Sequence, residues 1–311
     1  MDRRTFIGSV AGGLLAVPLS NAQSARIYRV GVVLAGGPYY HAVEGLRDGL
    51  KEVGLTEGQD YVFDVRDTKG DLKAAEEAAR SLEEEKVDLI FSVPTSVSLA
   101  AKRATTKIPI VFFAGSDPVE SGLVSSFAKP GDRITGVYSL SQELTGKRLE
   151  MLKQIAPRIQ KVAVFYNPAN PVVADSVKSA RDAARQLGIV LIEREVRSSD
   201  ELQGGLRALT NAAADAMFLV TDATIESHAS LIVEAGKIKK LPTMFYDRSL
   251  VAEGGLASCD ASIGCLCSSG LSLRDWEVQP TPNLSGAQPN EHSQECPTHV
   301  RPSTRNGSRR P

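Results

Sequence analysis

The stretch Val30-Gly31-Val32-Val33-Leu34 has the pattern of a buried parallel strand, because its apolar run is continuous and soon ends at Gly36-Gly37-Pro38. Val162-Ala163-Val164-Phe165-Tyr166 repeats this pattern about 130 residues later. At a similar offset, Asp215-Ala216-Met217-Phe218 repeats Asp88-Leu89-Ile90-Phe91. This offset has the length of one ordinary domain and is too long for a solenoid repeat, so it predicts two similar lobes.

Strand and helix signals alternate along both halves. Apolar residues at three- and four-residue spacing, such as Val43, Leu46 and Leu50, predict helices between the strands. Strands are expected at 29–35, 61–65, 87–93 and 108–113, and again at 162–166, 189–194, 216–221 and 243–246. Short connections of this kind require right-handed crossovers. We therefore expect an α/β protein of two Rossmann-like lobes, each with a parallel sheet, and a cleft between them.

The first residues have the pattern of an export signal. Arg3-Arg4 precedes an apolar run from Ile7 to Leu19 that is too short to span a membrane, and Ser20 and Ala22 offer a cleavage point. Residues 1–22 are thus expected to be a twin-arginine-type signal peptide, with a buried N-terminal helix as the alternative. No cysteine stands directly after the apolar run, where a lipid-anchored mature protein would begin. The sequence therefore predicts a soluble periplasmic protein without a lipid anchor.

Composition changes abruptly after Ser258. All four cysteines and the one tryptophan lie beyond it, lysine no longer occurs, and the apolar residues lose helical and strand periodicity. We interpret residues 259–311 as an aberrant, disordered tail translated in a shifted reading frame; a natural low-complexity tail is the alternative. The spacing of Cys265, Cys267 and Cys296 matches no zinc pattern, so no metal site is expected.

The body of the chain divides into two expected lobes, residues 23–140 and 141–258. The net charge of the whole chain is −1 with both signs interspersed, which argues against a nucleic-acid partner. The sequence contains no Gly-x-Ser-x-Gly elbow, no phosphate-binding loop and no Gly-x-Gly-x-x-Gly after the first strand. We expect a monomer that is not an enzyme and has neither catalytic residues nor a cofactor.

Polar residues follow the predicted strands, at the edge where ligands meet open α/β sheets. Thr95 and Ser96 open a helix, where hydroxyl and backbone N–H groups can hold a carboxylate or phosphate. The other candidates at strand ends are Ser116, Asp117, Asn167 and Asp222, with Tyr39 and Tyr246 as aromatic walls. An anion-binding helix terminus together with an aspartate fits an amino-acid zwitterion. Each residue also has a plainer interpretation as a helix cap or turn former.

The chain resembles bacterial ABC-transporter substrate-binding proteins of the type I periplasmic fold, in the group with tryptophan- and phenylalanine-binding members. The resemblance is carried by the export signal and by residues 29–32, 88–96, 108–112, 116–119, 122–124, 135–137 and 241–255. It implies a hinged receptor that closes on its solute and delivers it to a permease in the inner membrane. It also implies that Thr95, Ser96, Ser116, Asp117, Asn167 and Asp222 lie near the ligand.

The resemblance ends at Ser258, where relatives continue with another strand, a helix and a final crossing between lobes. We therefore expect weak packing of the second lobe and poor stability. Two other functions stay open: an exported hydrolase using Asp117 or Asp222 as base, and a periplasmic sensor. An amino acid is the expected solute, with small carboxylates, nucleobases and sugars as alternatives.

Overall fold

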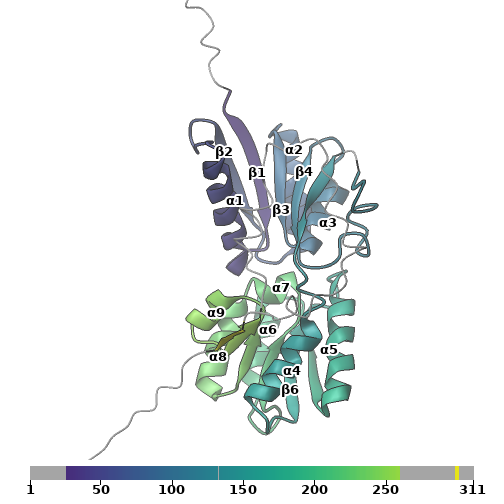
Figure 1. The fold of residues 1–311 in the computed structure, drawn as a ribbon, viewed down its shortest axis with the longest axis vertical. Coiled ribbons are helices and arrows are strands. Elements are labelled where there is room, and N and C mark those ends of the chain that lie inside the picture. The colour runs from purple at the N-terminus through teal and green to yellow at the C-terminus, as the bar shows by residue number, and fades with distance from the viewer. Residues whose placement is uncertain (1–25, 132, 260–297, 301–311) are drawn as a thin grey trace, which may run out of the picture.

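The computed structural model describes residues 26–131, 133–259 and 298–300, which form two α/β lobes stacked along the long axis (Figure 1). The first lobe contains a parallel five-stranded sheet in the order β2-β1-β3-β4-β5. Its strands are β1 (Tyr28–Leu34), β2 (Tyr61–Asp67), β3 (Leu89–Val93), β4 (Ile110–Ala114) and β5 (Ile134–Tyr138).

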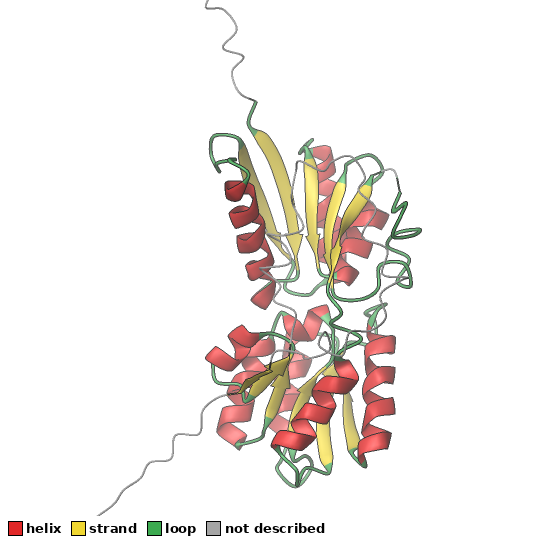
Figure 2. Cartoon of the chain, in the orientation of Figure 1, coloured by secondary structure: helices red, strands yellow, loops and turns green. Residues whose placement is uncertain are grey.

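The strand order places the helices of the first lobe on both faces of its sheet. The chain moves from β1 outward to β2 and then back past β1 to β3. Right-handed crossovers in opposite directions put α1 on one face and α2 on the other, where α2 packs against α3. The helical segments are η1 (Gly37–Tyr39), α1 (Tyr40–Glu52), α2 (Leu72–Glu84) and α3 (Thr95–Ala104). The carboxyl ends of the strands face the second lobe (Figure 2).

The second lobe repeats this order as β10-β9-β8-β6-β7, with β11 added beyond β10. The strands are β6 (Lys161–Tyr166), β7 (Val190–Glu195), β8 (Ala216–Leu219), β9 (Thr243–Phe245), β10 (Ala257–Cys259) and β11 (Thr298–Val300). The helices are α4 (Thr145–Ile155), α5 (Val173–Leu187), α6 (Ser199–Ala208), α7 (Ala223–Glu226), α8 (Ala229–Lys239) and α9 (Arg248–Ala252). The predicted fold class of two parallel-sheet α/β lobes is confirmed.

The end of the second sheet involves the predicted tail. β11 pairs antiparallel with β10, with Ser258 opposite His299, and Cys259 is buried and disulfide-bonded. The other residues of the tail and the expected signal peptide at 1–22 lie outside the described residues. Among the helices that the structure describes, none is long and apolar enough to cross a membrane.

Candidate binding site

Thr95 fastens together two loops of the first lobe. It is the first residue of α3, and its Oγ1 accepts hydrogen bonds from the backbone N–H groups of Gly115 (3.0 Å) and Ser116 (3.1 Å). The loop after β3 is thereby held against the loop after β4. Thr95 thus fixes the positions of the two loops at the carboxyl ends of β3 and β4. Its hydroxyl oxygen already accepts hydrogen bonds from the protein.

Ser96 and Ser116 are the first-lobe candidates whose hydroxyls are not engaged. Their exposed fractions are 1% and 2%, and neither Oγ has a hydrogen-bond partner in the protein. Buried polar atoms in native proteins are nearly always hydrogen-bonded, so each of these needs a partner from a solute or water. The N-cap of α3, Pro94, makes no side-chain cap bond, which leaves the first N–H groups of α3 without the usual side-chain acceptor.

Asp117 forms a turn in the structure, which is the alternative role expected for it from the sequence. Its Oδ1 accepts hydrogen bonds from the backbone N–H groups of Val119 (2.7 Å) and Glu120 (3.0 Å). The side chain lies near Ser116 in the chain, but this carboxylate oxygen is committed to the turn that follows β4.

Asp222 is a buried cap at the start of α7. Its carboxylate accepts N–H hydrogen bonds from Asn167 (2.7 Å), Thr224 (2.8 Å) and Ile225 (3.3 Å). Burial raises the pKa of Asp222 to about 6, although these N–H groups and the Asn170 side chain lower it. The carboxylate therefore organises the loops after β6 and β8.

Asn167 belongs to a chain of hydrogen bonds that reaches the first lobe. Its Nδ2 donates to Thr224 Oγ1 (3.0 Å), and that hydroxyl donates to the Gly70 carbonyl (3.1 Å). Gly70 has φ +76°, and a Cβ built on it would lie 2.6 Å from Thr224 Cα. Only glycine permits so close an approach, which seats α7 against the first lobe.

The structure brings Tyr39 and Tyr246 together from different lobes. Their ring centroids are 6.5 Å apart with an interplanar angle of 22°. The Tyr39 hydroxyl donates to Glu226, whereas the Tyr246 hydroxyl is buried without a hydrogen-bond partner. Burial raises the pKa of both tyrosines well above the ordinary value. The predicted aromatic walls thus face each other where the lobes meet.

Two buried charged residues near the carboxyl ends of the strands, Glu226 and Arg148, are not among the residues predicted from the sequence. Each is 1% exposed. Burial raises the pKa of Glu226 to about 8; the Tyr39 hydrogen bond and Arg148 lower it, and Asp222 raises it. The spacing Thr145, Arg148, Leu149, Leu152 was the available signal for Arg148, because it places the arginine on the buried face of a helix.

Several buried hydroxyls without a protein partner lie at this side of both lobes. They are those of Ser96 after β3, Ser116 after β4, Thr221 after β8, Tyr246 after β9 and Thr145 at the start of α4. Other buried polar atoms without a partner lie inside elements, such as Ser176 in α5 and Ser258 in β10. The hydroxyls named first can hydrogen-bond the polar groups of a small molecule. Within the described ranges, no group of three or more His, Cys, Asp and Glu side chains could hold a metal ion.

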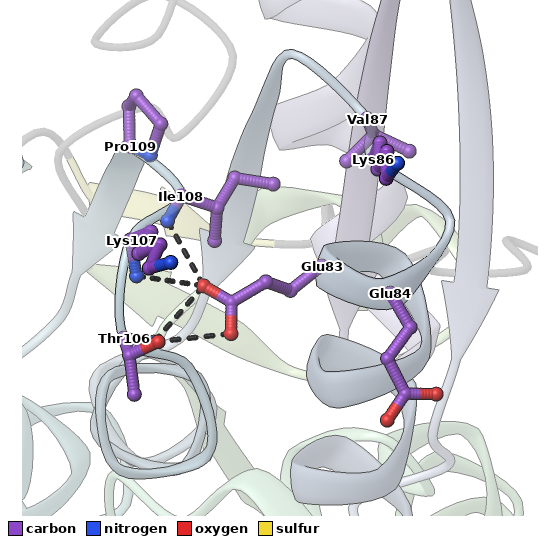
Figure 3. A pocket seen from close by; sticks show the side chains of 8 residues that line it. All are labelled: Glu83, Glu84, Lys86, Val87, Thr106, Lys107, Ile108 and Pro109. Carbon is purple, nitrogen blue, oxygen red and sulfur yellow. Dashed lines mark hydrogen bonds between the residues drawn. The ribbon is translucent and has the colours of Figure 1, made fainter.

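A surface pocket of about 490 Å³ lies at the opposite, amino-terminal ends of β3 and β4 (Figure 3). The Glu83 carboxylate in it accepts N–H hydrogen bonds from Thr106, Lys107 and Ile108. Although burial raises the pKa of Glu83, these N–H groups bring it below its ordinary value. Its carboxylate therefore ties α2 to the loop before β4, and none of the predicted site residues lines this pocket.

Two relatives resemble this chain in sequence. The tyrosine-binding protein of Clostridioides difficile is 29% identical over 218 residues, and the match covers 70% of this chain. This match spans 62% of the length of that protein. A conserved domain protein from Vibrio cholerae has a TM-score of 0.71 at 28% identity, covering 78% of this chain and 82% of the other.

A third comparison bears on the fold alone, because its identity is low. The ABC domain from Streptococcus pneumonia in complex with L-Trp has a TM-score of 0.70 at 22% identity. The match covers 83% of this chain and 88% of that one. The model of the ABC transporter substrate binding protein family matches residues 29–263. Since this match takes in both lobes, the chain belongs to the family of ABC transporter substrate-binding proteins.

Proposed function

We propose that this protein is the exported solute-binding receptor of an ABC uptake transporter and that it binds an amino acid between its lobes. The observation that carries the proposal is the set of buried, unpartnered hydroxyls at the carboxyl ends of strands in both sheets. A solute between the lobes would satisfy both halves of this set only when the lobes come together. Binding is therefore coupled to hinge closure.

The arrangement of charges favours a zwitterion. Ser96, Ser116 and the start of α3 offer hydrogen-bond donors to a carboxylate, and the helix dipole adds to this. Asp222 provides an acidic group for an ammonium on the second-lobe side. The similarity to a tyrosine-binding protein supports an amino acid with an aromatic side chain.

The proposal extends to the whole chain. Residues 1–22 direct export, 23–140 and 141–258 form the two lobes, and the loaded monomer delivers its solute to a permease in the inner membrane. A hydrolytic role for Asp117 or Asp222 gains no support, because both carboxylates accept hydrogen bonds from backbone N–H groups. The membership in a substrate-binding family supports transport over catalysis.

Thermal unfolding against a panel of amino acids, small carboxylates, nucleobases and sugars tests this function. A solute that binds only the folded form should add about 2.7 kcal/mol of stability at a hundredfold excess over its Kd. We expect a selective shift with aromatic amino acids and one-to-one binding without turnover in calorimetry. A product in the equilibrated mixture, or a cooperative transition that no amino acid shifts, would contradict the proposal.

Replacing Thr221 with valine is expected to weaken solute binding about tenfold without lowering stability. Its hydroxyl is buried and has no protein partner, so the isosteric change removes a hydrogen bond only from the solute complex. Thr105→Val is the matched control, because Thr105 Oγ1 donates to the Ala101 carbonyl at 2.7 Å. The control should lose stability and keep its affinity. Titration calorimetry and urea unfolding of both variants check this, and equal affinities would refute the role of Thr221.

A further inference from the structure

A carboxylate and a hydroxyl meet where the lobes touch. Tyr39, in η1 of the first lobe, donates its hydroxyl hydrogen to Glu226 Oε2, in α7 of the second lobe. The side chains are 3% and 1% exposed, so the contact is shielded from water. A hydrogen bond between two lobes exists only while they are together. This bond is therefore a marker of the arrangement in which the lobes are in contact.

The backbone around Glu226 lies very close to the backbone of the first lobe. A Cβ on Gly37 of the first lobe would lie 3.0 Å from the Glu226 carbonyl oxygen and 3.1 Å from Ser227 Cα. On the same short helix, the Thr224 hydroxyl donates to Gly70 of the first lobe. α7 is thus the segment of the second lobe that is seated on the first.

We propose that Tyr39 and Glu226 form a latch, a pair of positioning residues that stabilises the contact between the lobes. Through this contact the hydrogen bond between the two side chains sets the affinity for the solute. The part of this inference that concerns affinity rests on the proposed function. The arrangement of the lobes can be measured without any solute.

The latch depends on pH because its carboxyl group is buried when the lobes meet. The groups that face Glu226 are Tyr39 from η1, Tyr246 after β9, Arg148 from α4 and Asp222 at the start of α7. Burial dominates and raises the pKa of Glu226 to about 8. When the lobes separate, water reaches the carboxyl group, and its pKa returns toward about 4.3.

These two pKa values determine whether a rise in pH strengthens or weakens the contact between the lobes. Between about pH 4.3 and about pH 8 the arrangement in contact holds one proton more than the separated arrangement. The contact is therefore fully stabilised at the lower end of this window and loses stability as the pH rises through it. One proton changes the equilibrium by at most about tenfold per pH unit. Asp222 contributes little between about pH 6 and about pH 9, because burial raises its pKa only to about 6 and its carboxyl group is ionised over most of that range.

Small-angle X-ray scattering of the full chain without solute, at about pH 6 and about pH 9, tests the latch. The wild type should have a larger radius of gyration at the higher pH. Glu226→Gln cannot ionise and should stay compact at both values, whereas Tyr39→Phe should be expanded at both. Tyr40→Phe is the matched control, since its hydroxyl donates to Asp67 Oδ2 at 3.1 Å within the first lobe. It should behave as the wild type.

Two outcomes would overturn the latch: a wild type whose radius does not change, or a Glu226→Gln variant that expands as the wild type does. Circular dichroism at both pH values confirms that each variant is folded. Calorimetry with L-tyrosine is the second measurement, in which the wild-type Kd should rise by up to about tenfold per pH unit and the Glu226→Gln Kd should stay constant. Scattering as expected with no tyrosine binding would count against the proposed function and leave the latch standing.

Discussion

Replacing Arg148 with methionine is expected to lower the free energy of unfolding by about 3 kcal/mol. The arginine Nε donates to the Cys259 carbonyl at 2.7 Å, and Nη1 and Nη2 donate to the Ser141 carbonyl and hydroxyl at 2.6 Å and 3.0 Å. Methionine fills the space but leaves buried acceptors without donors. This penalty exceeds the gain from no longer burying a guanidinium, because the acceptors stay where they are. Urea unfolding measures the difference.

Arg133 provides a control for the Arg148 experiment, because the two arginines donate to acceptors in different parts of the molecule. Ser141 lies on the connection between the sheets, between β5 and α4, whereas Arg133 donates to the carbonyls of Lys102 and Thr105 inside the first lobe. Arg133→Met should therefore lose stability without loosening the connection. A glutamate-specific protease should cut at exposed Glu143 faster only in the Arg148 variant. A loss below about 0.5 kcal/mol would show that Arg148 is not a structural tie.

Replacing Gly70 with alanine is expected to keep the two lobes from meeting and to weaken solute binding by about tenfold to a hundredfold. The new Cβ would lie 2.6 Å from Thr224 Cα and 2.8 Å from the Ala223 carbonyl oxygen. Both are backbone atoms, so no side-chain rotation can relieve the overlap. The least costly response is a displacement of α7 from the first lobe. Calorimetry measures the affinity, and scattering measures the expansion of the molecule.

Gly58→Ala separates this overlap from the cost of the backbone conformation. Gly58 has φ +85°, close to φ +76° at Gly70, but nothing lies within 4 Å of a Cβ built on it. Both substitutions should therefore share a backbone cost of about 1 kcal/mol, and only Gly70→Ala should change affinity and shape. Equal affinities in the two variants would mean that the close approach at α7 has no part in binding.

The parts of the fold that the sequence predicts are those decided by neighbouring residues. The run from Arg29 to Ala35 predicts a strand, and the structure has β1 at Tyr28–Leu34. Asp71 stands directly before α2, and its side chain accepts from the N–H groups of Lys73 and Ala74 as a helix cap does. Apolar runs and helix caps depend only on residues a few positions apart, so they can be recognised without knowledge of the tertiary structure.

The parts of the site that the sequence does not predict depend on distant partners. Tyr39 and Glu226 are 187 positions apart, and Arg148 and Cys259 are 111 apart. Nothing beside Glu226 in the sequence distinguishes it from a solvated glutamate, because its burial comes from the other lobe. For Asp222, the sequence leaves a ligand and a cap equally open, and the structure shows the cap bonds.

Because α7 is short, it limits how this substrate-binding protein could evolve or be redesigned. The four residues of this helix and its cap hold the loops of the second lobe, reach across to Gly70 and carry the Tyr39 partner. A mutation in α7 would change two properties in one step: which solute is preferred, and how often the two lobes are in contact. Such effects would be strongly epistatic, so libraries aimed at new specificities would do better to vary the strand-end serines and leave α7 unchanged.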